Sequence, residues 1–327
     1  MSPLEHVVQS QQFDTKFLMD LFEFADFMKE NEYYVSDMLK GKTIAMLFYE
    51  PSTRTRFSFE SAATRLGANK ITTENAKEFS SASKGETLQD TIKVMDSYVD
   101  FIVMRHFQDD ASDIAATVST KPIINAGSGK AQHPTQALLD LYTIYNEVGR
   151  LDKVDIMVVG DLLRGRTVES LVYLLSKFDN NEFCFISPNN SKVKPGIKQH
   201  LEEHNIKYEE SEDLDRYLSR ADVVYMTRIQ KERFDNPIEY EKAKGNYILD
   251  MDNVPKMKES SIIMHPLPRV DEINVSVDND HRAKYFQQAQ NGLYVRMALL
   301  AMLNKNKLNP WLKIKTNVKK YLSNNHK

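Results

Sequence analysis

The sequence predicts an α/β protein built from two doubly wound parallel-sheet domains. Short apolar, β-rich runs recur along the chain, and helix-like segments separate most of them, which is the pattern of parallel α/β structure. At 327 residues the chain is long enough for two domains. The predicted strands lie at Ile44–Tyr49, Phe101–Met104, Pro122–Asn125, Ile156–Val159, Phe183–Ile186, Val223–Met226 and Ile262–Met264.

A helix-like stretch from about His133 to Val148 ends at Gly149, where a second α/β series begins. We therefore place the domain boundary there. Regularly spaced apolar residues between 291 and 304 predict a late, mostly buried helix. The predicted parts are a first domain, residues 1–149; a second domain, residues 150–290; a C-terminal helix, residues 291–304, which packs back on the first domain; and a lysine-rich tail, residues 305–327.

Composition limits the classes of function. The 43 Lys and Arg residues against 46 Asp and Glu residues give a net charge of −3, so we expect no nucleic-acid partner and no membrane partner. Cys184 is the only cysteine, which excludes an internal disulfide and a cysteine-based zinc cage, and favours a cytoplasmic setting. Glu5 and His6 precede any apolar run, and no stretch approaches the ~20 apolar residues that span a bilayer, so we expect neither export nor insertion.

The most informative motif, Ser52-Thr53-Arg54-Thr55-Arg56, joins a predicted strand to a predicted helix. Backbone N–H groups and the positive dipole end favour a phosphate at such a helix start, and Arg54 can add a bidentate, charge-assisted grip. An ordinary helix cap needs one Ser or Thr and no arginine. We therefore favour an anion site over a capped surface helix.

Three more segments could contribute to such a site. Lys84 lies in a Ser-rich segment that reads as a mobile loop, although a plain turn and helix cap would use the same residues. Arg105 follows a predicted strand at its carboxyl end, where open α/β sheets place their ligands. His133 and Gln136 are three residues apart at a predicted helix start, so both side chains could touch one small ligand.

The second half of the chain supplies further cations. Arg166 stands at a predicted helix entrance, where a positive residue suits a carboxylate ligand better than it suits the helix dipole. Arg228 and Gln230 can point the same way on an extended chain and form a carboxylate clamp. In His265-Pro266-Leu267-Pro268, two prolines fix a loop whose carbonyl oxygens can face an amine or amide; for His265 we expect a structural hydrogen bond.

Together, Ser-Thr-Arg-Thr-Arg, the serine-lysine segment, His-Pro-Thr-Gln and His-Pro-Leu-Pro-Arg-Val-Asp-Glu resemble the catalytic chains of the aspartate carbamoyltransferase family, from near the N-terminus to about Leu303. The resemblance implies one domain that binds carbamoyl phosphate, another that binds aspartate, and a homotrimer with shared active sites. It also implies transfer of the carbamoyl group to the amine of L-aspartate, giving N-carbamoyl-L-aspartate and phosphate, an early step of de novo pyrimidine biosynthesis. Neither a cofactor nor a metal is implied.

The resemblance also implies roles for individual residues. Thr55, Arg105 and His133 would donate to the carbamoyl oxygen, and Ser80 and Lys84 would reach in from the adjacent subunit. The catalytic set is Arg54, Thr55, Arg105 and His133. The residues that would bind carbamoyl phosphate are Ser52, Thr53, Arg54, Thr55, Arg105, His133, Gln136, Ser80, Lys84, Leu267 and Pro268. Those that would bind aspartate are Lys84, Arg166, Thr167, Arg228 and Gln230. Glu50 would pair with Arg166 and Arg233 when the two domains close.

The sequence is compatible with two alternative functions. An ornithine-type transcarbamoylase shares the carbamoyl phosphate half, but it usually carries His-Cys-Leu-Pro and a Ser-Met-Gly motif, whereas this chain has Pro266 and the arginine-bearing run from Thr227 to Gln230. A catalytically silent binding subunit of the same fold is the second. The sequence leaves open a separate regulatory chain, allostery, assembly beyond a trimer, and the role of the tail, for which a solvated terminus is favoured over a partner-recruiting segment.

Overall fold

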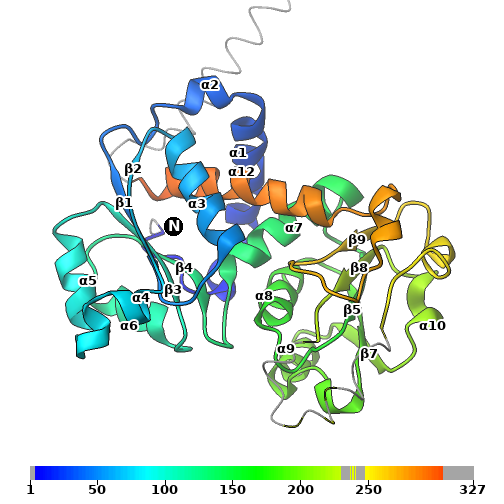
Figure 1. Cartoon of the computed structure of the whole chain (residues 1–327). Coiled ribbons are helices and arrows are strands. Elements are labelled where there is room, and N and C mark those ends of the chain that lie inside the picture. Colours follow the sequence, from blue (N-terminus) through cyan, green and yellow to red (C-terminus); the bar gives the residue numbers. More distant parts are fainter. Residues whose placement is uncertain (1–3, 230–235, 237, 239, 241–246, 305–327) are drawn as a thin grey trace, which may run out of the picture. The chain divides into compact units, whose positions relative to one another are not determined.

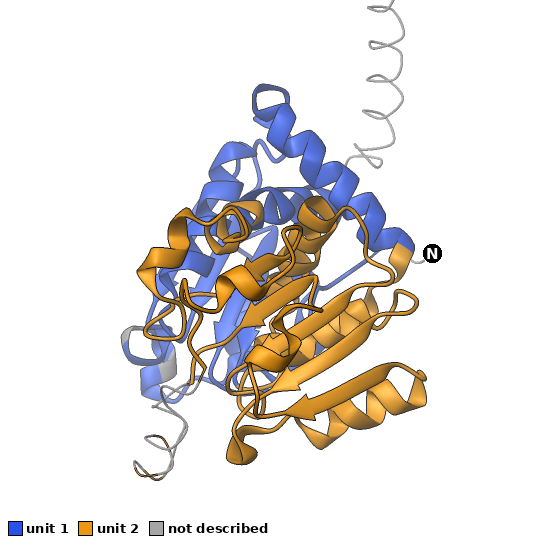
Figure 2. Cartoon of the chain, turned by 90° about the vertical axis from the view of Figure 1, so that its right-hand side faces the viewer, with its two compact units in different colours: residues 1–8, 16–129, 292–327 blue, residues 9–15, 130–291 orange. Residues whose placement is uncertain are grey.

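The computed structural model describes residues 4–229, 236, 238, 240 and 247–304 (Figure 1). The chain forms two compact units, which Figure 2 shows in different colours. Unit 1 comprises residues 1–8, 16–129 and 292–327, and unit 2 comprises residues 9–15 and 130–291. These units assign the segment 130–149 to unit 2; the predicted domain boundary at 149 and 150 stays a prediction.

Unit 1 is built on a four-stranded parallel sheet in the order β2-β1-β3-β4. The N-terminal segment extends this sheet, because the Val7 amide donates to the Ile123 carbonyl at 2.7 Å and Val7 forms a parallel bridge with Ile124. The strands are β1 (Thr43–Phe48), β2 (Asn69–Glu74), β3 (Phe101–His106) and β4 (Ile123–Ser128).

Helices cover both faces of this sheet (Figure 1). One face packs Leu47, Ile102 and Met104 against Ile92 and Ala115 of α5 and α6, whereas α1, α3 and α12 lie on the other face. The helical segments before α12 are α1 (Thr15–Glu30), α2 (Glu32–Val35), α3 (Thr53–Arg65), α4 (Ala76–Phe79), η2 (Ser81–Lys84), α5 (Leu88–Asp96) and α6 (Ala111–Val118).

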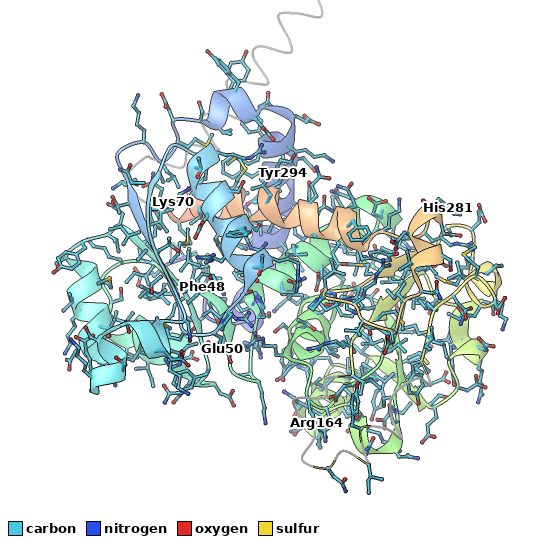
Figure 3. The ribbon with its side chains drawn as sticks, viewed as in Figure 1. Phe48, Glu50, Lys70, Arg164, His281 and Tyr294 are labelled. Carbon is cyan, nitrogen blue, oxygen red and sulfur yellow. The ribbon has the colours of Figure 1, made fainter. Side chains whose placement is uncertain are left out.

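The last helix, α12 (Tyr285–Leu303), begins six residues before the predicted start at 291. Its C-terminal part contacts helices of unit 1. The Tyr294 hydroxyl lies 3.4 Å from Glu32 on α2, and Arg296 donates to the Ser58 hydroxyl on α3 at 2.8 Å (Figure 3). The predicted packing of a late helix on the first domain is therefore confirmed.

Unit 2 contains a five-stranded parallel sheet in the order β7-β6-β5-β8-β9. Helices α8 and α9 lie on one face and α10 on the other, so this sheet is also doubly wound (Figure 1). The strands are β5 (Asp155–Val159), β6 (Glu182–Ile186), β7 (Lys207–Ser211), β8 (Val223–Met226) and β9 (Ile262–Met264). The helical segments are η1 (Ser10–Gln12), α7 (Pro134–Val148), α8 (Arg166–Leu175), η3 (Asn189–Ser191), α9 (Pro195–Glu203), α10 (Asp215–Leu218), η5 (Val254–Lys256) and η6 (Val275–Asn279).

All seven predicted strands are present, and the described residues contain two further strands that the sequence patterns do not predict. These are β2 and β7, the outer strands at one edge of each sheet, and most of their residues are exposed or half-buried. Such strands need no continuous apolar run, because one edge and much of their surface face water. The predicted end of the helix at Gly149 is also confirmed: Gly149 adopts a left-handed φ of 78° directly after α7.

Cys184 is a buried free cysteine in β6, and burial raises the pKa of its thiol to about 12. The described residues include no helix of sufficient length and apolar character to cross a membrane. Over the same residues, no three His, Cys, Asp or Glu side chains gather as metal ligands would.

Candidate active site

In unit 1, Glu50 and Arg105 lie together at the carboxyl edge of the sheet. Arg105 is opposite Phe48 in the β1–β3 ladder, and Glu50 follows β1 two residues later (Figure 3). The Arg105 Nε lies 3.6 Å from the Glu50 carboxylate, and its Nη1 donates to the Ala126 carbonyl at 3.4 Å. This pairing, which the sequence did not predict, holds a partly buried guanidinium beside the start of α3.

Helix α3 begins at Thr53, and Ser52 is its N-cap residue, as the motif predicted. Within the described part of the chain, the Ser52 side chain makes no capping hydrogen bond; its carbonyl instead accepts the Arg56 amide at 3.1 Å. Thr55 is buried in the first turn, with 7% of its surface exposed. The hydroxyl of Ser52 and the first amides of the helix can therefore serve an anion.

The two arginines of the motif have different surroundings. Arg56 lies 3.0 Å from Glu74 at the end of β2 and 3.9 Å from Glu60 one turn along α3, so its charge is balanced within the fold. Arg54 is exposed in the first turn of the helix. The structure thus separates a structural arginine from a candidate ligand-binding arginine only two residues away.

The serine-lysine segment is more ordered than the predicted loop, because it contains α4 and η2. Ser80 is half-buried at the end of α4 and its hydroxyl donates to the Ala76 carbonyl. Lys84 is exposed at the end of η2. The Thr87 hydroxyl then caps α5 by accepting the Asp90 amide at 3.2 Å. The ammonium group of Lys84 thus sits on an exposed turn between two helices.

In unit 2, the first turn of α7 carries His133 and Gln136, as predicted. His133 is the N-cap residue, is 4% exposed, and its amide donates to the Ser170 hydroxyl on α8 at 3.1 Å. The Gln136 amide bonds back to the His133 carbonyl at 3.0 Å, and its side-chain Nε2 donates to Asp140 at 2.8 Å. The His133 main chain and the Gln136 side chain are therefore anchored at one helix start.

The residues predicted to bind the substrate aspartate come after strands of unit 2. Arg166 is the first residue of α8 and is buried, with 8% of its surface exposed. Thr167 follows Arg166 and hydrogen-bonds with Tyr225. Burial raises the pKa of Tyr225 well above its usual value, and the hydrogen bond from Thr167 opposes this shift. Arg228 is half-buried just beyond β8. Gln230 and Arg233 lie outside the described residues.

The segment His265-Pro266-Leu267-Pro268 follows β9, and hydrogen bonds of the His265 ring hold it in place. The His265 Nδ1 accepts the Leu267 amide at 2.7 Å, and its Nε2 lies 2.6 Å from Glu272. Burial raises the pKa of Glu272. The hydrogen bond from His265, together with hydrogen bonds from the backbone amides of Val270 and Glu272, outweighs burial and lowers this pKa below its ordinary value. Leu267 adopts a left-handed φ of 54°, a conformation that costs a non-glycine residue about 1 kcal/mol or more. The expected structural role of His265 is confirmed.

The charge state of His106 could not be predicted from the residue pattern. Its ring is buried between Tyr49 and Phe107, and its Nδ1 accepts the Gln108 amide at 3.1 Å. Burial lowers its pKa to about 4, so the ring is neutral near pH 7. Arg105, next to it in the chain, is therefore the cation at the end of β3.

Each unit therefore presents arginines at or beyond the carboxyl ends of its central parallel strands. In unit 1, Arg105 is the penultimate residue of β3 and Arg54 lies in the first turn of the helix after β1; in unit 2, Arg166 begins the helix after β5 and Arg228 lies two residues beyond β8. Carboxyl ends of parallel strands are where open α/β sheets bind ligands, and arginine matches phosphate and carboxylate oxygens bidentately. Unit 1 is suited to a phosphate at a helix start, and unit 2 to carboxylates.

Comparison with known proteins agrees with this division. Residues 5–146 match the family description "Aspartate/ornithine carbamoyltransferase, carbamoyl-P binding domain", and residues 152–303 match its "Asp/Orn binding domain". Aspartate carbamoyltransferase 1, chloroplastic, of Pisum sativum is 53% identical over 303 residues, which cover 92% of this chain and 78% of the pea protein. The chain belongs to the aspartate carbamoyltransferase family.

Solved structures of this family show the same fold. The catalytic subunit of aspartate transcarbamoylase from Methanocaldococcus jannaschii is 47% identical, with a TM-score of 0.86, and the match covers 93% of this chain and 100% of that one. The Trypanosoma cruzi enzyme in complex with carbamoyl phosphate and aspartate is 36% identical, with a TM-score of 0.86, over 92% and 96% of the two chains. Membership of the aspartate carbamoyltransferases makes this chain a carbamoyl-group transferase.

Proposed function

We propose that this aspartate carbamoyltransferase uses the arginine-bearing strand ends of its two units for two anionic substrates. The reaction transfers the carbamoyl group of carbamoyl phosphate to the amine of L-aspartate, an early step of de novo pyrimidine biosynthesis. The observation that carries the assignment of residues is the placement of Arg54 and Arg105 at the phosphate-type helix start, and of Arg166 and Arg228 after strands of unit 2.

Carbamoyl phosphate is held at the start of α3. The amides and hydroxyls of that turn, with Arg54 and Arg105, bind the phosphate. Gln136 and the carbonyl groups of Leu267 and Pro268 hold the carbamoyl nitrogen. The proposed phosphate ligands are Ser52, Thr53, Arg54, Thr55 and Arg105, with Ser80 and Lys84 supplied by an adjacent subunit of a homotrimer.

In the reaction, the aspartate nitrogen forms a bond to the carbamoyl carbon, and the bond from that carbon to the bridging phosphate oxygen breaks. Thr55, Arg105 and His133 stabilise the charge that develops on the carbamoyl oxygen. The departing phosphate accepts the amine proton, so no side-chain base is needed. Each oxyanion donor is worth ~3–4 kcal/mol, and the alignment of the two substrates ~7–11 kcal/mol.

The second substrate is a dicarboxylate. Arg166 and Arg228, with Thr167, Gln230 and Lys84, bind its two carboxylates. A half-buried Arg228 after β8 favours aspartate over ornithine, because an arginine attracts the second carboxylate of aspartate and repels the side-chain ammonium of ornithine.

Several further properties belong to this proposal. Residues 1–149 and 150–290 are the two substrate domains, and Glu50 pairs with Arg166 and Arg233 when they close. The active form is a homotrimer in the cytoplasm, a setting supported by the single, buried, free Cys184. A separate regulatory chain is a possible further partner.

Purified protein should form N-carbamoyl-L-aspartate and phosphate in equal amounts when given carbamoyl phosphate and L-aspartate. With L-ornithine in place of aspartate, we expect no product above the rate without enzyme. Product from ornithine would identify the ornithine-type alternative. Binding of carbamoyl phosphate without product from either amine would identify a silent binding subunit.

A further inference from the structure

We propose that Asp140 is a positioning residue that orients both groups holding the carbamoyl nitrogen, Gln136 and the segment His265–Pro268, which is called the β9 loop below. This inference rests on the proposed function, because it assigns these two groups to the carbamoyl end of the substrate. Asp140 lies one turn after Gln136 on α7 and its side chain is fully buried.

The Asp140 carboxylate accepts hydrogen bonds from three side chains. Its Oδ1 accepts from Gln136 Nε2 at 2.8 Å and from Gln288 Nε2 at 2.6 Å, and its Oδ2 accepts from the Tyr225 hydroxyl at 2.7 Å. The three donors come from α7, α12 and β8 and carry no charge. A carboxylate in this position is an acceptor only, so it dictates which way each amide faces.

The first branch sets the orientation of Gln136. Because Nε2 of Gln136 donates to Asp140, its Oε1 is the atom directed away from the carboxylate. An amide oxygen accepts hydrogen bonds, and the carbamoyl group of the substrate carries an NH₂ donor. With the amide turned over, Gln136 would place its nitrogen against that NH₂ and its oxygen against a carboxylate. Asp140 therefore selects the orientation that recognises the carbamoyl nitrogen.

The second branch sets the β9 loop. Gln288 donates to Asp140 through Nε2, and its Oε1 accepts the His265 amide at 2.9 Å. His265 Nδ1 in turn accepts the Leu267 amide. An unbroken run of hydrogen bonds thus leads from Asp140 to the backbone of Leu267, whose carbonyl is assigned to the same NH₂ group. Both acceptors of the carbamoyl nitrogen depend on one carboxylate.

The test compares carbamoyl phosphate with acetyl phosphate, which carries a methyl group in place of the NH₂. Both ligands share the phosphate contacts of unit 1, so the ratio of their dissociation constants reports recognition of the nitrogen alone. We expect the intact protein to prefer carbamoyl phosphate by roughly 100-fold, since a site built for a hydrogen-bond donor rejects an analogue that lacks it. Calorimetry on the purified full chain gives both constants.

Asp140→Ala should reduce that preference to less than about fivefold, because Gln136 and the β9 loop lose their common acceptor. Inorganic phosphate should bind the variant as it binds the original protein. Merely structural damage would weaken all three ligands together. Asp140→Ala with the full preference intact would overturn the proposal, as would an equal loss for all three ligands.

Asp140→Asn is the conservative variant, in case the alanine variant fails to fold. Its oxygen can accept both glutamine amides, and its NH₂ can donate to the Tyr225 oxygen, because a hydroxyl both donates and accepts. We expect it to keep the preference within about threefold, and the double variant Asp140→Asn with Tyr225→Phe to lose more of it. A preference lost completely in Asp140→Asn with the melting temperature unchanged would contradict this geometry. Absence of carbamoyl phosphate binding in the unchanged protein would instead contradict the proposed function.

Discussion

The candidate residues of unit 1 and of unit 2 are held in place in different ways. In unit 1 they lie around the start of α3 and the end of β3, and backbone geometry together with the Glu50–Arg105 ion pair positions them. In unit 2 a buried hydrogen-bond network runs from the Gln136 side chain through Asp140 and Gln288 to the His265 amide, and it positions Gln136 and the β9 loop. Unit 1 is therefore sensitive mainly to residues that touch the phosphate, and unit 2 also to residues that touch no substrate.

The largest expected effect is on activity, and it should distinguish Arg54 from Arg56, the two arginines in the first turn of α3. Arg54→Ala should lower kcat/KM for carbamoyl phosphate by roughly 10²–10³-fold, and Arg105→Ala likewise, because each loses a charged phosphate or oxyanion donor worth ~3–4 kcal/mol. Arg56→Ala is the matched control: it breaks the ion pair with Glu74 and should lower stability while leaving kcat/KM within a few-fold. Initial rates with saturating aspartate measure all three variants.

Normal turnover by Arg54→Ala would remove that residue from the mechanism. A large loss of activity in Arg56→Ala, with its melting temperature unchanged, would show that the motif acts through both arginines and not through one.

The second prediction concerns the pH dependence of unit 1. Burial lowers the pKa of His106 to about 4 from an ordinary value near 6.5, so the folded protein takes up its proton later than the unfolded chain does. The free energy of unfolding is therefore highest above pH 6.5, where the ring is neutral in both states. It decreases by about 3 kcal/mol at most as the pH falls to about 4, because the unfolded chain binds the proton more tightly. Denaturant unfolding between pH 4 and 7 should show this slope, and His106→Phe, which keeps a ring against Tyr49, should flatten it. An unchanged slope in His106→Phe would contradict the assignment.

The third prediction tests the carboxylate half. Arg228→Ala should raise the KM for aspartate by roughly 10–100-fold and change the KM for carbamoyl phosphate much less, since a hydrogen bond to a charged group is worth about 1.5–3 kcal/mol. Arg216→Ala is a suitable control, because Arg216 lies over the Tyr217 ring on α10 and is not one of the proposed ligand-binding residues. Equal changes in both KM values for Arg228→Ala would argue against a separate aspartate site.

The smallest expected effect is a pH dependence of stability in unit 2, at lower pH than the one that His106 causes in unit 1. Hydrogen bonds from Arg282 lower the pKa of Asp280 to about 2. This carboxylate therefore contributes about 2 kcal/mol above its unfolded pKa near 4, and the contribution is lost as the pH falls towards 2. Asp280→Asn should destabilise the protein by that amount at pH 7 and by much less near pH 2.5. A destabilisation that does not depend on pH would show that the ion pair is not its cause.

Local patterns were sufficient for most of the fold. The seven predicted strands are those with buried apolar runs, and the helix from Pro134 to Val148 begins with a proline and ends before a glycine, as expected. Strands β2 and β7 were missed because they are exposed and polar at sheet edges. The motif at Ser52 was recognisable because its whole geometry, a strand end followed by a helix start, lies within a few residues.

The class of fold, the phosphate-type helix start and the family could be predicted from residue patterns, because each depends on residues that are neighbours in the chain. The pairing of Arg56 with Glu74 and the neutral state of His106 became evident from the folded arrangement alone. The same arrangement makes the Asp140 carboxylate a buried acceptor for residues up to 148 positions away. Burial and long-range hydrogen bonds set the charge and orientation of these groups, and neither can be read from the spacing of residues along the chain.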